Sequence, residues 1–370
     1  MARTVLITGG AGFIGSHLAD QLLEAGDEVR ILDSLVGQVH EGAPRPDYLA
    51  PEAELMVGDV GDADTLRRAL AGVDAVVHLA ARVGVGQSMY EIADYVSANT
   101  GATAALLQVL LENPVERLVV ASSMSIYGEG AYATADGTPV APVERTPAQL
   151  DRGEWEPRGP GREPLVAAPT GESTPPALAS VYALTKYDQE QLCLLYGAAY
   201  DVPTVALRFF NVYGPRQALS NPYTGVIAIF ASRLLNGRAP LVFEDGLQRR
   251  DFVNVADAAR ACRLALDRGE AAGHAVNVGS GEPVSILDLA RELARLLGRE
   301  IEPELTGKFR VGDIRHCFAD VSRARELLGF EARVGRDEGM AALAEWLAEQ
   351  APTDRVEAAT AELVSRGLAR

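Results

Sequence analysis

The fold is decided by the stretch Val5-Leu6-Ile7-Thr8-Gly9-Gly10-Ala11-Gly12-Phe13-Ile14-Gly15-Ser16-His17-Leu18. Its apolar opening predicts a buried strand, and its end predicts the first turns of a helix. Between them, Gly9, Gly12 and Gly15 are spaced as Gly-x-x-Gly-x-x-Gly. In such a turn the first glycine permits a tight bend, the second lets the backbone approach a pyrophosphate, and the third lets helix and strand pack closely. The stretch therefore predicts a dinucleotide site at a helix N-terminus, where free N–H groups and the positive dipole end attract phosphate.

A strand–helix rhythm continues outward from this turn. Apolar runs at 28–33, 54–58, 75–80 and 117–122 predict strands, and residues 65–71 and 95–111 predict helices. Near-continuous apolar strands that alternate with helices are typical of a parallel sheet covered on both faces. Because crossovers are right-handed, we expect an α/β fold with a doubly wound, Rossmann-type sheet, followed by a smaller C-terminal α/β lobe that binds substrate.

Residues 129–178 interrupt the rhythm with a segment rich in Pro, Gly and charge. The segment is either a disordered loop or a surface insertion held by Trp155 and Leu165. Long loops in compact domains are usually functional, so we expect it to pack near the mouth of the site. We assign residues 1–210 and 251–280 to the dinucleotide-binding domain, residues 211–250 and 281–352 to the substrate lobe, and residues 353–370 to a tail that is either a short helix or frayed.

A carboxylate at the end of the second predicted strand indicates which dinucleotide is bound. Asp33 can accept hydrogen bonds from both ribose hydroxyls and would repel a 2′-phosphate, which predicts NAD rather than NADP. Asn99 is either an ordinary residue at the start of its helix or part of the site. Together with the three glycines, the expected cofactor contacts are Phe13, Ile14, Asp59, Val60, Leu79, Ala80, Ala81 and Asn99.

A tyrosine and a lysine four residues apart supply the expected chemistry. Tyr182 and Lys186 lie on one face of the helix predicted over 180–200. A phenol with its ordinary pKa near 10 is a poor base at neutral pH, but a nearby ammonium and the positive nicotinamide favour the phenolate. Tyr182 can then take a proton from a substrate hydroxyl while hydride leaves the same carbon. Lys186 can also hold the nicotinamide ribose, and Ser123, which follows the strand at 117–122, can orient the reacting oxygen.

Together these motifs resemble the extended short-chain dehydrogenase/reductase superfamily, in particular its nucleotide-sugar epimerases and dehydratases. The resemblance runs over roughly residues 3–350 and includes the segments 208–216, 250–255, 277–281 and 310–313. It implies an NAD-dependent enzyme in which Phe210 flanks the nicotinamide. It further implies a nucleotide-sugar substrate that is bound by Ser88, Ser123, Tyr182, Asn211, Arg216, Arg250 and Arg310.

The residues after Ser123 bear on the reaction. Sugar 4,6-dehydratases typically have Thr-Asp-Glu at this position, because loss of water needs an acid and a base. This chain instead has Met124 and Ser125 after Ser123. Epimerisation at carbon 4 needs only removal and return of a hydride. The stretches 86–91, 126–130, 155–158 and 219–225 are similar to dTDP-L-rhamnose 4-epimerases, which favours a dTDP-6-deoxyhexose as substrate.

Several alternatives on the same scaffold stay open. They are a UDP-sugar 4-epimerase, a UDP-uronic acid decarboxylase and a net nucleotide-sugar dehydrogenase. A non-catalytic NAD-binding protein is disfavoured, because such a protein would be expected to lose Tyr182 or Lys186, and both are present. The resemblance also implies a homodimer formed through the helices at 95–111 and 180–200.

Composition restricts the other partners. The formal net charge is -17, which argues against nucleic acid because such proteins usually carry a basic face. No apolar run approaches the roughly 20 residues that span a bilayer, so no membrane partner is expected. The dispersed cysteines Cys193, Cys262 and Cys317 suggest neither disulfides nor a zinc site and fit a reducing cytoplasm. No metal is expected in the insertion, where residues 158–162 replace a Cys-x-x-Cys-like element of some relatives.

Overall fold

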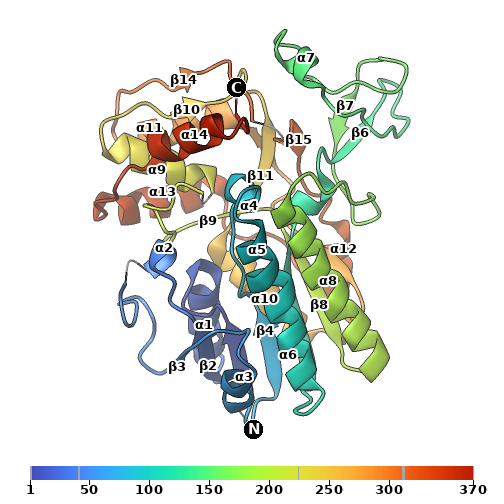
Figure 1. The fold of residues 1–370 in the computed structure, drawn as a ribbon, viewed down its shortest axis with the longest axis vertical. Helices are drawn as coiled ribbons and strands as arrows, with labels where there is room; N and C mark the ends of the chain where they lie inside the picture. The colour runs from blue at the N-terminus through green and yellow to red at the C-terminus, as the bar shows by residue number, and fades with distance from the viewer. Residues whose placement is uncertain (1, 41, 224, 311–312, 370) are drawn as a thin grey trace.

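The computed structural model describes residues 2–40, 42–223, 225–310 and 313–369. Its centre is a seven-stranded sheet in the order β12-β8-β5-β4-β1-β2-β3, and every neighbouring pair runs parallel. The doubly wound fold expected from the sequence is confirmed (Figure 1). The strands are β1 (Thr4–Thr8), β2 (Glu28–Asp33), β3 (Glu54–Val57), β4 (Ala75–His78), β5 (Arg117–Ser123), β8 (Thr204–Phe209) and β12 (Ala275–Val278).

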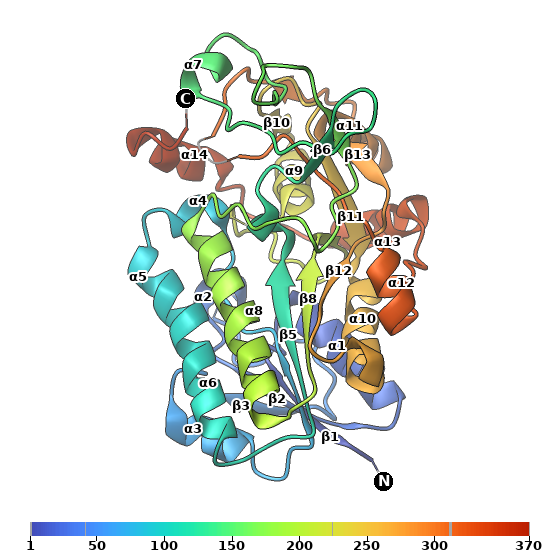
Figure 2. The same cartoon turned by 90° about the vertical axis from the view of Figure 1, so that its right-hand side faces the viewer.

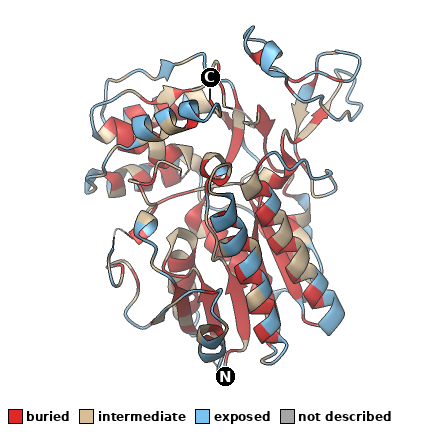
Figure 3. Ribbon diagram, viewed as in Figure 1, coloured by how far each residue is buried: buried red, intermediate tan, exposed pale blue. Residues whose placement is uncertain are grey.

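Helices cover both faces of this sheet (Figure 2). Alternate side chains of β1 point to opposite cores, with Val5 and Ile7 in one and Leu6 in the other. The first core is closed by α1 (Phe13–Glu24), α10 (Val255–Asp267) and α12 (Ser322–Leu328). The second is closed by α3 (Ala63–Ala69), α6 (Ala102–Leu110) and α8 (Val181–Tyr200). Figure 3 shows that the central strands are largely buried. Burial on both faces explains why most of these strands are almost uniformly apolar.

A second lobe lies beyond the carboxyl ends of the strands (Figure 1). Its sheet is built on β11 (Arg249–Asn254), which pairs with β9 (Asn211–Tyr213), β13 (Pro283–Ser285) and β15 (His316–Cys317). Its core is closed by α9 (Val226–Leu235), α11 (Ile286–Leu296) and α13 (Arg336–Ala348). A short ladder of β10 (Leu241–Val242) and β14 (Glu304–Leu305) borders it. The carboxyl ends of the central strands and this lobe therefore face each other.

Two elements connect the two parts of the molecule. Strand β11 pairs with β9, β13 and β15, which lie outside the seven-stranded sheet, while Val253 of the same strand packs into the first core. Helix α12 also packs into that core, beside α1 and α10. Because β11 runs directly into α10, this strand–helix unit spans both parts.

The insertion and the tail are both structured. In the insertion, β6 (Ala131–Ala133) pairs antiparallel with β7 (Val166–Ala168), and α7 (Pro147–Leu150) projects beyond them (Figure 1). The tail forms α14 (Val356–Ser365), so the helical alternative is the one found. A Cβ added to Gly86 would touch the side chain of Leu363, and Arg366 lies 4.3 Å above the ring of Tyr90. The tail thus lies against the loop that follows β4.

Three further observations concern membranes, metals and the cysteines. Within the described ranges, no helix is both long enough and apolar enough to cross a membrane. The same part of the chain holds no group of three or more His, Cys, Asp or Glu residues arranged to bind a metal. All three cysteines are buried with free thiols.

Candidate active site

The glycine turn between β1 and α1 has the geometry that close approach to a phosphate requires. Gly9 adopts a φ of +70°, and a Cβ there would lie 2.8 Å from the backbone nitrogen of Ala80. A Cβ at Gly15 would lie 2.6 Å from the carbonyl oxygen of Gly9, so only glycine lets the helix pack this closely. A Cβ at Gly12 would meet that same oxygen at 3.2 Å. No described side chain caps α1, and its first turn, which includes Phe13 and Ile14, carries no acid. Its N–H groups therefore remain available to an anion.

Asp33 is fixed beside this turn. Its Oδ2 accepts the N–H of Ala11 at 3.1 Å, and its Oδ1 accepts the N–H of Leu35 at 2.9 Å. The nearby imidazole of His40 adds no positive charge at neutral pH, because burial lowers its pKa further than Asp33 raises it. A carboxylate has about four acceptor sites, so Asp33 can still accept two ribose hydroxyls. The residues present therefore fit an NAD ribose and disfavour a 2′-phosphate.

The other expected cofactor contacts lie at neighbouring strand ends. Asp59 is exposed beside the buried Val60, in a turn where its Oδ1 accepts the N–H of Gly61 at 2.7 Å. After β4, Leu79, Ala80 and Ala81 are only partly buried.

Asn99 has a different setting from the one expected. The helix begins earlier, at α5 (Ile92–Tyr95), and Asn99 lies in the π-helical turn at 96–101 that joins α5 to α6. Its Oδ1 accepts the N–H of Arg82 at 2.7 Å, and its Nδ2 donates to the carbonyl of Arg82 at 3.1 Å and to Oγ1 of Thr185 at 3.0 Å. Asn99 therefore connects the loop after β4 to α8. Its contact on α8 is Thr185, the residue before Lys186.

Ser88 also has a positioning contact. It ends α4 (Val85–Ser88) and is fully buried. Its Oγ accepts the N–H of Tyr182 at 3.0 Å and donates to the carbonyl of Val85 at 2.7 Å. Tyr182 lies in the first turn of α8, and Ser180 caps this helix by accepting the N–H of Ala183 at 3.1 Å. Ser88, expected at the sugar, thus holds the first turn of α8 in place.

Ser123 ends β5, and Tyr182 lies in the first turn of α8. The Oγ of Ser123 accepts the N–H of Ser125 at 3.1 Å and the hydroxyl of Ser125 at 2.9 Å. Burial raises the pKa of Tyr182, and the side chain of Ser123 opposes the rise. Ser123 is therefore close enough to Tyr182 to influence its phenol.

Lys186 is buried at one end of a series of hydrogen-bonded polar side chains. Burial lowers its pKa to about 8, and its Nζ donates to Oε1 of Gln189 at 2.7 Å. Gln189 in turn contacts Oγ1 of Thr103 at 2.8 Å and Nε2 of His78 at 3.1 Å. Burial, aided by the charge of Lys186, lowers the pKa of His78 to about 3, so its ring is neutral. This series anchors the ammonium group to the ends of the central strands.

The effect of Lys186 on the pKa of Tyr182 stays a prediction. Burial and Ser123 act on that pKa in opposite directions, and the ammonium of Lys186 donates to Gln189. The positive nicotinamide is the other expected source of charge that would favour the phenolate.

The residues expected to bind a nucleotide sugar do not all lie together. Phe210 is buried directly after β8, with its ring 6.3 Å from that of Tyr127. The Oδ1 of the neighbouring Asn211 is buried and has no hydrogen-bond partner among the described residues, which leaves it for a ligand. Arg310 and Arg250 converge on Asp313, at 3.1 and 3.7 Å.

Arg216 does not join them. Its Nη1 binds Oδ2 of Asp20 on α1 at 2.7 Å, and its guanidinium lies 5.5 Å above the ring of Tyr48. It therefore lies on the dinucleotide side of the molecule. Residues 311–312 and 224, which belong to two of the family-like stretches, lie outside the described residues.

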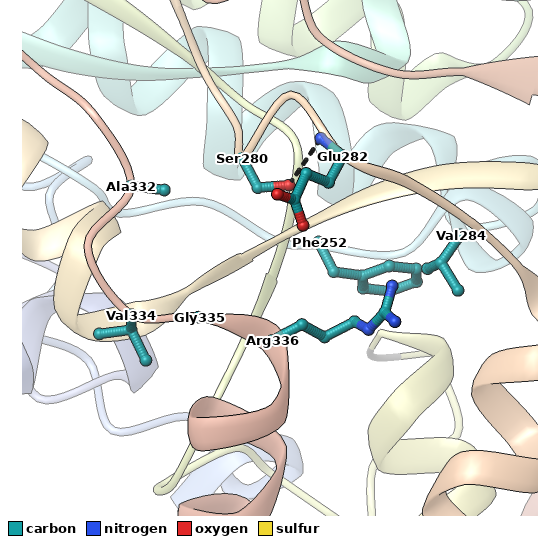
Figure 4. A pocket seen from close by; sticks show the side chains of 8 residues that line it. All are labelled: Phe252, Ser280, Glu282, Val284, Ala332, Val334, Gly335 and Arg336. Atoms are coloured by element: carbon teal, nitrogen blue, oxygen red, sulfur yellow. Dashed lines mark hydrogen bonds between the residues drawn. The ribbon is translucent and has the colours of Figure 1, made fainter.

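A pocket in the lobe lies apart from all of these residues (Figure 4). Its basic residue, Arg336, faces Glu292 at 3.4 Å, and Ser280 accepts the N–H of Glu282 at 3.1 Å. The lining consists of Phe252, Ser280, Glu282, Val284, Ala332, Val334, Gly335 and Arg336. None of the expected site residues borders it, so it has no part in the chemistry at the strand ends.

Sequence reasoning missed two residues that support the site. Gln189 lies three residues after Lys186, and this spacing on a helix was the available signal. Glu190 is fully buried and accepts the hydroxyl of Ser122 at 2.6 Å and Nη2 of Arg208 at 2.6 Å. It joins α8 to the ends of β5 and β8, and its partners are too distant in sequence to be read from any motif.

Comparison with known proteins agrees with this geometry. A profile described as the NAD dependent epimerase/dehydratase family matches residues 5–147 and 159–279. A dTDP-L-rhamnose 4-epimerase of Burkholderia thailandensis is 37% identical over 352 residues, covering 94% of this chain and 96% of that protein.

Solved structures are similar over nearly the whole chain. A UDP-glucose 4-epimerase of Thermotoga maritima with UDP-glucose has a TM-score of 0.77 at 29% identity, covering 94% of this chain and 99% of its own. A UDP-glucuronic acid 4-epimerase of Bacillus cereus, in complex with UDP-glucuronic acid and NAD, has a TM-score of 0.77 at 27% identity with the same coverage. The chain therefore belongs to the NAD-dependent epimerase/dehydratase family, and NAD is its cofactor.

Proposed function

We propose that the protein is a nucleotide-sugar 4-epimerase that acts on a dTDP-6-deoxyhexose such as dTDP-L-rhamnose. The observation that carries the reaction type is the pair of Ser123, at the end of β5, and Tyr182, in the first turn of α8. Met124 and Ser125 follow Ser123 in the chain. The pair supplies one base and one orienting hydroxyl, and the residues after it add no carboxylate for the loss of water. The dTDP-L-rhamnose 4-epimerase relative supports the substrate.

The proposed roles follow from the positions of the side chains. NAD, when bound, would supply the acceptor and donor of the hydride that leaves and returns to carbon 4 of the sugar. Tyr182 takes the proton of the 4-hydroxyl and later gives it back, while Ser123 holds the same oxygen. Lys186 holds the nicotinamide ribose, and the glycine turn and Asp33 bind the pyrophosphate and adenosine ribose. Phe210 borders the nicotinamide, and Asn211, Arg250 and Arg310 meet the diphosphate of the sugar nucleotide.

The test is to incubate the purified protein with dTDP-L-rhamnose, without added NAD, and to follow the sugar by NMR. We expect the carbon-4 epimer to appear, because a cofactor that is regenerated in each cycle need not exchange. If dTDP-L-rhamnose is unchanged while a UDP-sugar is epimerised, the dTDP-sugar assignment is wrong and the reaction type stands. Product formation in step with consumption of added NAD would instead support a net dehydrogenase.

We also propose a homodimer formed through α5, α6 and α8. These helices lie side by side on one face of the sheet (Figure 2). Apolar side chains are exposed on them, including Ile92, Leu184 and Leu195, and Val96 is exposed in the turn that joins α5 to α6. Burying such a patch is favourable. Light scattering should give about twice the 39.3 kDa of one chain, and a mass near that of one chain would refute the dimer.

A further inference from the structure

A buried cluster of charges joins the insertion to the lobe. We call it the insertion clasp. Two arginines hold four carboxylates in it, and the side chains of Arg145, Glu244 and Arg315 are only 4%, 2% and 1% exposed. The members are Glu129, Arg145, Glu156, Glu244, Asp245 and Arg315. Three come from the insertion and three from the lobe.

Arg145 makes the first half of the clasp. Its Nε donates to Oε1 of Glu129 at 2.9 Å, and its Nη1 donates to Oε1 of Glu244 at 2.8 Å. Its Nη2 donates to the backbone carbonyl of Asp313 at 2.7 Å. One guanidinium thus connects the insertion, the segment after β10 and the segment before β15.

Arg315 makes the second half. It binds Oε2 of Glu244 at 2.9 Å, Oδ1 of Asp245 at 2.6 Å and Oε1 of Glu156 at 2.7 Å. Burial acts to raise the pKa of Glu156, but hydrogen bonds from His316 and Arg315 outweigh it and hold that pKa at about 2. Glu156 is therefore ionised, and bound to the lobe, throughout the neutral range.

Glu244 shows how strongly the clasp constrains the backbone. Its φ is +52°, a left-handed conformation that glycine adopts without strain and that costs other residues about 1 kcal/mol or more per position by the general rule. Such a conformation persists where the surroundings over-determine it. Here they do so because the carboxylate bridges both buried arginines.

The same segments carry the two arginines that converge on Asp313. Arg310 lies 4.5 Å above the ring of Phe243, the residue before Glu244. Arg250 donates to the carbonyl of Arg315 at 2.9 Å, and Asp313, whose carbonyl binds Arg145, pairs with both Arg250 and Arg310. Each of these two arginines therefore rests on a residue that the clasp holds.

Part of the clasp lies outside the residues that the family profile matches. The family profile matches residues 5–147 and 159–279 and leaves out 148–158. Glu156 lies in that gap, and its carboxylate binds both Arg315 and His316.

We propose that the insertion is a positioning element of the substrate site, in which Arg145 and Glu156 act through Glu244 and Arg315 to place Arg250 and Arg310 for the diphosphate. This inference rests on the proposed function, because it assumes a nucleoside diphosphate at those arginines. The cause is geometric: recognition of a diphosphate by guanidinium groups depends on their orientation, and a shift of about 1 Å is enough to weaken it substantially.

Matched pairs of variants separate positioning from general stability. Glu156→Gln and Arg145→Met each break the clasp. Glu154→Gln and Arg152→Met change a pair in the same insertion that binds only at the surface, with side chains 43% and 59% exposed. Dissociation constants for dTDP and for UDP are measured by calorimetry on each NAD-containing protein, together with kcat, KM and the amount of NAD retained.

We expect Glu156→Gln and Arg145→Met to weaken binding of the preferred nucleoside diphosphate on the order of tenfold. KM for the sugar nucleotide should rise in proportion, kcat should change by less than about threefold, and NAD retention should be unchanged. The surface variants should stay within about twofold of wild type. The double variant should be no weaker than the worse single one, because both act on one unit.

Each other outcome has a definite meaning. If the clasp variants bind the nucleotide as wild type does, the inference is wrong and the proposed function stands. If kcat or NAD retention falls while nucleotide binding does not, the clasp is only structural and the inference is again wrong. If Arg145→Met fails to fold, Glu156→Gln decides alone, since its side chain is half exposed. If wild type binds neither dTDP nor UDP, the proposed function fails first and the inference falls with it.

Discussion

Removing one hydroxyl should show how the catalytic tyrosine is tuned. The hydroxyl of Ser123 opposes the rise that burial causes in the pKa of Tyr182. Ser123→Ala removes this hydroxyl, and with it the acceptor for the N–H and the hydroxyl of Ser125. A hydrogen bond to a charged group contributes about 1.5–3 kcal/mol. At about 1.36 kcal/mol for each factor of ten, kcat should fall roughly 10- to 100-fold.

The pH dependence distinguishes this explanation from simple misplacement of substrate. Tyr182 acts as a base only when deprotonated, so loss of the Ser123 hydroxyl raises its pKa and moves the acid limb of the kcat profile to higher pH. Ser123→Thr, which keeps the hydroxyl, should restore the limb. Ser125→Ala removes only a donor to Ser123 and should have a smaller effect. A fall in kcat with no movement of the acid limb would refute the proposed tuning.

Three other perturbations test separate parts of the account. Gly15→Ala places a Cβ 2.6 Å from the carbonyl oxygen of Gly9, so this variant should be purified without NAD. In the control Gly37→Ala the added Cβ meets nothing within 4 Å, so this variant should retain NAD. Equal NAD content in both variants would contradict the role of the glycine turn in binding NAD. Asp33→Asn should lower the preference for NAD over NADP by about tenfold or more, measured as the ratio of dissociation constants; an unchanged ratio would exclude the ribose contact. The pKa of Glu156 is about 2 in the folded chain and near 4.3 when unfolded, so its stabilising contribution is present above pH 4.3 and is lost as the pH falls toward 2. The Tm difference between wild type and Glu156→Gln should accordingly shrink between pH 5 and pH 3, and a constant difference would contradict the ion pair.

The parts of the site that the sequence predicted are those fixed by local structure. Gly9, Gly12 and Gly15 lie within one turn and the start of α1, where the positive φ of Gly9 and the close approach at Gly15 favour glycine. Tyr182 and Lys186 share a helix face, and their relation follows from helical periodicity alone. The apolar runs predicted the strands of the doubly wound sheet because parallel strands are buried on both faces.

The contacts that the sequence did not predict are those set by tertiary structure. The polar groups of Ser88 and Asn99 are bound by α8 and by the loop after β4. Arg216 adopts a φ of +70° and turns toward Asp20, which no motif signals. Arg145 and Glu244 are far apart in sequence and meet only because the insertion folds onto the lobe.

The most direct test of the central claim uses substrate labelled with deuterium at carbon 4 of the sugar. The labelled dTDP-L-rhamnose is converted in ordinary water without added NAD, and the product is examined by NMR. The account predicts a carbon-4 epimer that keeps its deuterium at carbon 4, because the same hydride leaves and returns while the cofactor stays bound. Loss of the label to water, or conversion that requires added NAD, would contradict it.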